Sequence, residues 1–382
     1  MKYIDEFRDR NLALQIASQI RSEADPAKHY QFMEFCGGHT HAISRFGIVD
    51  LLPNNVEMIH GPGCPVCILP VGRVQTAITL SHFPGLILCT YGDMLRIPTA
   101  DGMSLLKAKA KGADVRMVYS SIDAVNIAQN NPDRQVVFFA IGFETTVPPT
   151  AVALQQARTA NLKNFSVYCN HVLTPPAIAH ILQSPEVREL GLVQLDGFIG
   201  PAHVSVVIGS QPYDYFVEEF QRPVVIAGFE PLDVMQAILM LIRQINANRI
   251  EVENEFSRAV LPNGNLKAQQ TVADVFELRR TFEWRGLGVI PYSALKIKAD
   301  YADFDAELRF PMEERSIADN KACECGAILR GVKRPQDCKI FGTICTPDNP
   351  IGSCMVSSEG ACAAHYRYGR FRDHHSSISA QV

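Results

Sequence analysis

Apolar residues along the chain follow two alternating patterns, one typical of amphipathic helices and one typical of buried strands. Residues 1–24 carry apolar positions at helical spacing and end before Asp25-Pro26, which predicts an amphipathic N-terminal helix. From about residue 29, short β-rich runs are each followed by a Gly/Pro turn and then by a helical stretch. This alternation is typical of α/β proteins with parallel sheets.

The same pattern predicts where the strands and helices of this α/β region lie. Strands are expected at 30–35, 56–60, 86–90, 115–119, 135–141, 165–170, 197–199 and 223–227. Helices are expected near 71–82, 103–111, 121–130, 148–159, 175–184 and 203–210. Because the first four strands and the last four alternate with helices in the same way, we predict that the chain builds the same α/β unit twice.

The C-terminal third has a different character. Residues 231 to about 280 follow a long helical pattern, and the tail from Cys323 is rich in Gly and Cys and has no periodicity. We expect this tail to be organised around its cysteines. The predicted divisions are an N-terminal helix that packs on the C-terminal domain (1–28), two α/β domains (29–132 and 133–235) and a C-terminal helical and cysteine-rich domain (236–382).

Composition and charge narrow the function classes. The 382 residues are 47% hydrophobic and 20% charged, which is typical of globular proteins and excludes a disordered or collagen-like chain. Domains of this length bury their own cores, so a metal site would serve function rather than folding. The 36 Lys+Arg against 40 Asp+Glu form no basic block, so we expect no nucleic-acid partner.

The distribution of apolar residues also predicts a cellular location. The first residues carry frequent charges and lack the apolar segment of a secretory signal, and no apolar run has the length of a membrane span. We therefore expect a cytoplasmic protein that does not contact membranes. In a reducing compartment, eleven cysteines indicate metal or redox chemistry rather than structural disulfides.

Polar motifs follow the predicted strands at matching places in the two units. The carboxyl edge of a parallel sheet is where ligands bind, because loops and helix N-termini converge there. Turn formation explains the Gly and Pro residues of these motifs but not their Cys, His and Glu residues. The motifs are CGGHTH (36–41), GPGCPVC (61–67) and YGDM (91–94), then GFETT (142–146), NHVLTPP (170–176) and GPAH (200–203).

Two cysteine motifs lie at this predicted edge. Cys36 and His39 place a soft thiolate and an imidazole three residues apart, next to glycines that let the backbone approach a ligand closely. The alternative is a buried cysteine in a glycine turn. Cys64 and Cys67 have the C-x-x-C spacing of thiol–disulfide oxidoreductases, in which one thiolate attacks and the other resolves. Together the three cysteines would form a redox-capable pocket.

Other reactive residue types in the α/β region are less informative. Glu144 and His171 could act as acid and base or could orient other groups, and a lone Glu in a turn is also typical of a helix cap or an ion pair. Cys89 and Cys169 lie within apolar strands and are expected to be inert core thiols. The usual nucleotide-binding and radical-enzyme motifs are absent from the sequence.

The tail holds a cluster of six cysteines. Four thiolates suffice for a [4Fe–4S] cluster, and soft sulfur ligands favour iron–sulfur centres or zinc over hard cations. Zinc is the alternative, although its sites usually show paired C-x₂-C knuckles that this tail lacks, and ordinary buried cysteines are a further one. The six are Cys323, Cys325, Cys338, Cys345, Cys354 and Cys362.

Taken together, the motifs resemble those of the HypD family of hydrogenase maturation factors. The resemblance covers nearly the whole chain and includes every motif cysteine. Besides CGGHTH, GPGCPVC and NHVLTPP, it rests on AIGFETT (140–146), GFIGPAHVS (197–205), AGFEPLDV (227–234), CECGAILRG (323–331) and FGTICTPDNPIGSCMVSSEGACAAHY (341–366).

This resemblance implies a fold and a role. It implies two Rossmann-like α/β domains and a [4Fe–4S] domain similar to that of ferredoxin:thioredoxin reductase. Family members act with the chaperone HypC as a scaffold that holds the iron on which the Fe(CN)₂CO group of [NiFe]-hydrogenase is assembled, and HypE delivers cyanide. Such a protein is a redox-active assembly scaffold rather than a turnover enzyme, and neither its electron donor nor the source of CO follows from the sequence.

The resemblance also assigns roles to individual residues. Cys36 would anchor the iron, His39 would be the essential histidine beside it, and Cys64 and Cys67 would relay electrons. In the tail, the family has four cluster ligands and a nearby thiol pair. We assign Cys323, Cys338, Cys345 and Cys362 as ligands and Cys325 and Cys354 as the pair, a choice that spacing alone does not dictate.

Two other functions are compatible with parts of the sequence. A thiol–disulfide reductase could take electrons from ferredoxin through the cluster and reduce a protein partner. A zinc-stapled binding module would explain the tail but would leave Cys36, Cys64 and Cys67 without a role.

Overall fold

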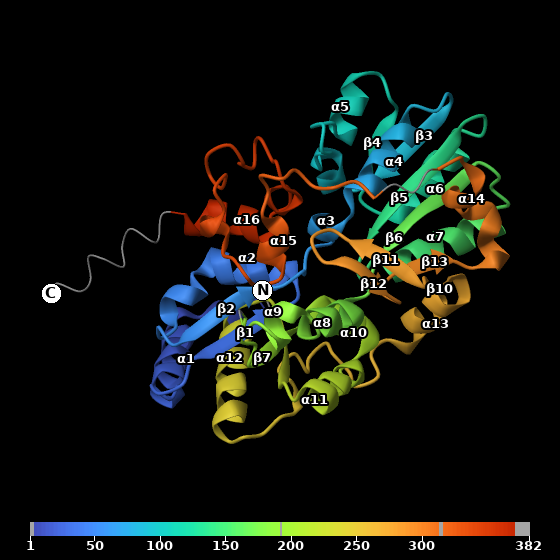
Figure 1. The fold of residues 1–382 in the computed structure, drawn as a ribbon. Helices are drawn as coiled ribbons and strands as arrows, with labels where there is room; N and C mark the ends of the chain where they lie inside the picture. The colour runs from blue at the N-terminus through green and yellow to red at the C-terminus, as the bar shows by residue number, and fades with distance from the viewer. Residues whose placement is uncertain (1–3, 192, 313–315, 371–382) are drawn as a thin grey trace.

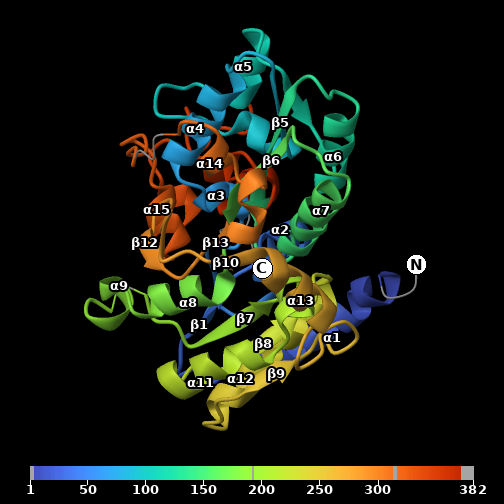
Figure 2. The same ribbon diagram turned by 90° about the vertical axis from the view of Figure 1, so that its right-hand side faces the viewer.

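Two parallel sheets form the body of the molecule, and the cysteine-rich tail lies against both (Figure 1). The structure is a computed structural model that describes residues 4–191, 193–312 and 316–370. Figure 2, turned by 90°, shows the first sheet in the lower half of the molecule and the second in the upper half. The α/β class with Rossmann-like parallel sheets is therefore confirmed.

The first sheet has five parallel strands in the order β2-β1-β7-β8-β9. Helices α1 (Arg10–Glu23), α2 (Gly37–Phe46) and α12 (Pro231–Asn246) pack on one of its faces through apolar side chains such as Ile20, Ile43 and Ile238. The strands are β1 (Tyr30–Glu34), β2 (Val56–His60), β7 (Gly197–Pro201), β8 (Val224–Ala227) and β9 (Val252–Asn254).

The second sheet has four parallel strands in the order β4-β3-β5-β6. Helices α6 (Ser121–Gln129), α7 (Val147–Thr159) and α13 (Leu266–Val275) cover one face, and α4 (Val71–Ser81) and α5 (Leu105–Ala110) pack on the other. The strands are β3 (Leu86–Thr90), β4 (Val115–Met117), β5 (Gln135–Gly142) and β6 (Phe165–His171).

The prediction of two units built one after the other was wrong in how it distributed the strands. Strands β1 and β2 pair with β7, while β3 and β4 pair with β5 and β6. The divisions at 29–132 and 133–235 therefore each mix strands of both sheets. The chain leaves the first sheet after β2 and returns to it after β6, so the first sheet is assembled from segments far apart in the sequence, whereas the second is built from the consecutive strands β3 to β6.

The segments between and beyond the sheets differ in part from the prediction. Short helices α8 (Thr174–Leu182), α9 (Pro185–Arg188), α10 (Ala202–Ile208) and α11 (Asp214–Phe220) lie between β6 and β8. The helical prediction for 231–280 holds for α12 and α13 but misses β9 and β10. Four short strands form two antiparallel pairs: β10 (Phe276–Leu278) with β13 (Leu295–Ile297), and β11 (Thr281–Trp284) with β12 (Gly288–Pro291).

The N-terminal helix packs on α12, most of which belongs to the predicted C-terminal domain (236–382). Ala17 and Ile20 of α1 are buried with Val234 and Ile238 of α12, on the face of the first sheet rather than on the cysteine-rich tail. Arg243 of α12 also forms a two-pronged ion pair with Glu23, both contacts at 2.7 Å. The apolar face of α1 thus completes the layer that covers the first sheet.

The tail has little regular structure. It contains α15 (Cys325–Leu329), α16 (Ala361–Ala364) and the single turn η7 (Ser353–Met355), after α14 (Ala306–Arg309). Residues 371–382 of the predicted C-terminal domain lie outside the described residues. Among the helices that the structure describes, none is long and apolar enough to cross a membrane.

Candidate functional site

The Cys36 loop connects the end of β1 to helix α2. Cys36 is the residue that precedes the first turn of α2, and it is only 8% exposed. His39 lies in the first turn of α2 and is fully buried. Its Nε2 atom lies 3.0 Å from the carbonyl of Ala227 and 2.9 Å from that of Gly228. Carbonyls only accept hydrogen bonds, so Nε2 carries the proton and Nδ1 keeps a free lone pair.

That lone pair has no partner in the described part of the chain. His39 Nδ1 is buried and accepts no hydrogen bond, which is costly for a polar atom. The His39 ring packs against the ring of Phe229, and the two ring centroids are 4.9 Å apart. A buried imidazole that is fixed through one nitrogen and open at the other has the usual arrangement of a metal-binding histidine.

A buried carboxylate fixes the conformation of the Cys36 loop by hydrogen bonds. Glu34, at the end of β1, is fully buried and accepts hydrogen bonds from Cys36 N at 2.8 Å and from the Thr40 hydroxyl. His60 Nδ1, at the end of β2, lies 2.9 Å from the same carboxylate. We did not predict this residue, although a glutamate within the apolar run YQFMEF was a detectable signal, because buried carboxylates need several partners.

The C-x-x-C motif lies directly against the Cys36 loop. Gly37 N donates a 3.0 Å hydrogen bond to the Gly63 carbonyl, and a Cβ on Gly63 would lie only 2.4 Å from Cys36 N. Cys64 and Cys67 form a disulfide at the start of α3 (Pro65–Ile68). Both are almost completely buried, with exposed fractions of 3% and 0%. The glycine is required because any side chain there would strike the backbone of Cys36.

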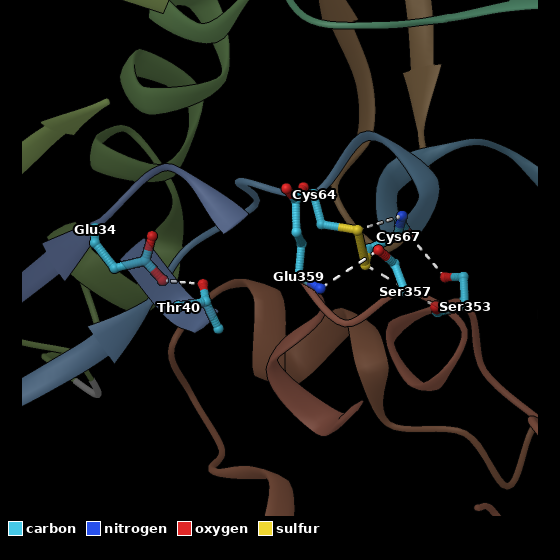
Figure 3. Close-up of a disulfide and its surroundings, with 7 residues drawn as sticks. All are labelled: Glu34, Thr40, Cys64, Cys67, Ser353, Ser357 and Glu359. Carbon is cyan, nitrogen blue, oxygen red and sulfur yellow. Dashed lines mark hydrogen bonds between the residues drawn. A yellow bond between two sulfur atoms is a disulfide. The ribbon is translucent and has the colours of Figure 1, made fainter. Parts of the chain in front are cut away.

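The tail reaches the same place from the far end of the sequence. Ser353 Oγ donates a 2.8 Å hydrogen bond to the Cys67 carbonyl, and Cys67 Sγ lies 3.9 Å from the Ser353 carbonyl (Figure 3). Ser353 directly precedes Cys354. Glu359 also approaches the Cys36 loop, since a Cβ on Gly37 would lie 2.4 Å from Glu359 Cβ. The three predicted cysteine groups are therefore neighbours in space.

Within the tail, most of the thiols are close together. The Cys325 thiol lies next to the thiols of Cys323 and Cys362. A Cβ on Gly352 would lie 2.4 Å from the sulfur of Cys323 and 2.6 Å from that of Cys325, so this glycine leaves room for both. Cys345 Sγ accepts a 3.4 Å hydrogen bond from Ile351 N. The Cys338 thiol instead contacts the side chain of Glu324.

These sulfur atoms suit a soft metal centre. Over residues 4–191, 193–312 and 316–370, no three His, Cys, Asp or Glu side chains surround a position for one metal ion. A four-iron cluster distributes its ligands over several irons, so its cysteines need not converge on one point. Packed thiols, a glycine that leaves space beside them and a backbone N–H directed at a sulfur fit such a cluster better than a hard cation.

Burial and charge control the acidity of these groups. Burial, followed by the negative charge of Glu359, raises the pKa of the Cys36 thiol far above its usual value. Contact with Cys325 and burial likewise raise the pKa of Cys323 and of Cys362. Without a cation these cysteines stay protonated at neutral pH, and a bound metal ion would displace their protons.

Glu144 and His171 have structural partners. Glu144 accepts hydrogen bonds from Thr174 N (2.7 Å) and Thr174 Oγ1 (2.9 Å), so it caps the first turn of α8. His171 is fully buried, and its Nε2 lies 3.0 Å from Thr150 Oγ1. Glu144 is therefore a helix cap, which was one of the alternatives that the sequence left open for this residue. Cys89 and Cys169 are buried in β3 and β6, as expected of core thiols.

Comparison with known proteins identifies relatives over the whole length. Residues 11–369 match the family model HypD, described as the hydrogenase formation hypA family. The chain is 67% identical to hydrogenase maturation factor HypD2 of Bradyrhizobium diazoefficiens over 374 residues, 98% of each chain. It is 66% identical to HypD of Cupriavidus necator, again over 98% of each chain. HypD of Escherichia coli is 46% identical over 96% of this chain and 98% of its own.

Proposed function

The chain belongs to the HypD family, and we propose that it acts in hydrogenase maturation as the scaffold that holds an iron ion while its CO and cyanide ligands are added. In this proposal Cys36 anchors the iron, and a tail [4Fe–4S] cluster and two cysteine pairs bring electrons to it. The observation that carries the proposal is the contact of the Cys36 loop, the Cys64–Cys67 disulfide and the Ser353-Cys354 turn in one buried region.

The Cys36 pocket supports an iron-anchoring role. Iron(II) with cyanide and CO ligands is a soft, electron-rich centre, for which a thiolate is a suitable protein ligand. Cys36 supplies the thiol, and His39 places an unpartnered Nδ1 one helical turn away. Glu34 fixes the backbone of Cys36, so the thiol keeps one position while the cargo changes its ligands.

A cavity lies beside the Cys36 loop, and we propose that partners reach the pocket through it. The cavity of about 300 Å³ is lined by Gly38, Glu359, Arg8 and Arg45, among other residues. Its place beside the Cys36 loop suits the entry of a ligand donor and of the iron. We propose HypC as the partner that shares the iron and HypE as the source of cyanide, as the family resemblance implies.

The sulfur groups support an electron path. A [4Fe–4S] cluster bound by Cys323, Cys338, Cys345 and Cys362 would supply single electrons that originate from an external low-potential donor. Cys325 and Cys354 would form the adjacent thiol pair, and Cys325 contacts two of the proposed ligands. Reduction of the Cys64–Cys67 disulfide takes up two electrons and two protons and yields two thiols beside Cys36.

Burial argues against a reductase that acts on other proteins. Thiol–disulfide exchange requires one thiolate to reach the sulfur of the other partner in line with the disulfide. Cys64 is 3% exposed and Cys67 is fully buried, beneath the Ser353 turn. In this arrangement a partner protein has no access to either sulfur. Electron transfer within the molecule does not require such access.

Infrared spectroscopy of the anaerobic complex with HypC tests the proposal. The wild-type complex is expected to show CO and cyanide bands, and Cys36→Ala is expected to abolish them while iron and sulfide in the tail persist. Cys89→Ala is the matched control, because it also removes a buried thiol but lies in β3 of the second sheet. Normal bands in Cys36→Ala would show that another group anchors the iron.

A further inference from the structure

Arg285 lies at the junction between the two proposed redox centres. It occupies the turn between β11 and β12, and its backbone N–H donates a 2.7 Å hydrogen bond to the carbonyl of Ile68, next to Cys67. The following residue, Gly286, lies in close contact with the tail, since a Cβ on Gly286 would lie 2.5 Å from Gly326 Cα. The same turn therefore contacts both the C-x-x-C helix and the first turn of α15.

The side chain of Arg285 is a buried cation with an incomplete set of partners. Only 4% of the side chain is exposed. Nε lies 2.6 Å from Asp319 Oδ1, a close ion pair whose atoms are not aligned as a hydrogen bond, and Nη1 has no hydrogen-bond partner in the described part of the chain. A buried guanidinium normally needs partners for its N–H groups, so this orphaned donor calls for a ligand.

The segment that carries the tail cysteines lies next to this guanidinium, through Asp319 and through the contact of Gly286 with Gly326. Asp319 is joined to the cysteine segment through the next residue, because Cys323 N donates a 2.9 Å hydrogen bond to the Asn320 carbonyl.

We propose that Arg285 is a positioning residue for electron transfer, whose buried charge next to the segment that carries Cys323 and Cys325 raises the reduction potential of the tail [4Fe–4S] cluster. The inference rests on the proposed function because it assumes that cluster. A cluster gains negative charge when it is reduced, so a nearby cation stabilises the reduced state. Asp319 carries the opposite charge and is expected to act in the opposite direction.

The test is a potentiometric titration of the full chain after anaerobic reconstitution with iron and sulfide, followed by cluster absorbance and electron paramagnetic resonance. Arg285→Gln removes the charge and is expected to disfavour the reduced cluster on the order of tenfold, which is about 59 mV for one electron. Arg285→Lys keeps the charge, so its reduction potential is expected to differ from that of the wild type by no more than about a quarter of that shift. Asp319→Asn is expected to shift the potential upward.

The control is Arg309→Gln, which removes an arginine bonded to the carbonyls of Phe165 and Lys163, away from the tail cysteines. If Arg285→Gln binds no cluster, the Asp319→Asn shift decides: an upward shift supports the proposal and an unchanged potential overturns it. Equal shifts in Arg285→Gln and Arg285→Lys also overturn it, because a purely structural role loses both. Wild-type protein that binds no cluster would overturn the proposed function, and this inference with it.

Discussion

Ser353 Oγ donates a 2.8 Å hydrogen bond to the carbonyl of Cys67, and this contact joins the cysteine-rich tail to the C-x-x-C motif across 286 residues. Ser353 is fully buried, so the bond is shielded from water. It places Ser353, which directly precedes Cys354, beside Cys67 of the Cys64–Cys67 disulfide (Figure 3). The tail and the C-x-x-C motif are therefore in direct contact at this bond.

We predict that Ser353→Ala uncouples the two redox groups. The variant leaves a buried carbonyl without its donor, which costs about 1–3 kcal/mol of unfolding free energy. With the cluster reduced, less of the Cys64–Cys67 disulfide is expected to open, as measured by alkylation and mass spectrometry. Ser121→Ala is the matched control, because Ser121 is equally buried and donates a 2.8 Å bond to the Pro149 carbonyl. Equal disulfide reduction in both variants would contradict the prediction.

The tail cysteines give a second prediction. Cys338→Ala and Cys345→Ala are expected to lose iron and sulfide and to destabilise the tail, because cluster binding and folding are coupled. Cys325→Ala and Cys354→Ala are expected to keep the cluster and to block electron transfer. Iron and sulfide analysis checks this. Since Cys325 contacts Cys323 and Cys362 while Cys338 contacts Glu324, the reverse result would mean that Cys325 is a ligand and Cys338 is not.

Gly63 gives a prediction about packing. In Gly63→Ala the new methyl group would lie 2.4 Å from Cys36 N and 2.6 Å from Cys36 Cα, and backbone atoms cannot rotate away. We expect a loss of about 1–3 kcal/mol of stability and a displaced Cys36 thiol. Thermal unfolding measures the first effect. Gly92→Ala is the control, because its methyl group would meet only the flexible Met117 side chain at 3.2 Å, and a similar loss there would refute the explanation.

Glu144 gives a prediction about pH. Burial raises the pKa of its carboxyl from 4.5 to about 7. The folded chain then holds this proton more tightly than the unfolded chain, so the contribution to stability is complete below pH 4.5 and is lost as the pH rises to about 7. Glu144→Gln stays neutral and is expected to remove this dependence, worth on the order of 3 kcal/mol.

Urea unfolding of the wild type and of Glu144→Gln at the two ends of this pH range measures the difference. The exposed Glu218→Gln is the control for the loss of a carboxylate. If the stability gap between wild type and Glu144→Gln were independent of pH, Glu144 would have an ordinary acidity in the folded chain.

The local pattern of the sequence determined the elements of the α/β region. Each strand predicted there appears within a few residues of its expected range, and so do the helices from α4 to α10 that were predicted. This is because an apolar run bounded by Gly and Pro determines local backbone conformation, whichever strand it later pairs with. The candidate cysteines were likewise evident from spacing alone.

Only the tertiary structure decided which strands share a sheet and which cysteines meet. The prediction grouped strands that are neighbours in the sequence. In the structure, β1 lies between β2 and the distant strand β7. Which strand covers the second edge of β1 depends on packing between distant segments, and local sequence does not encode that packing. Glu34 and Arg285 gained their roles in the same way. A buried charge is recognisable only through its partners, and His60 and Asp319 come from other parts of the chain.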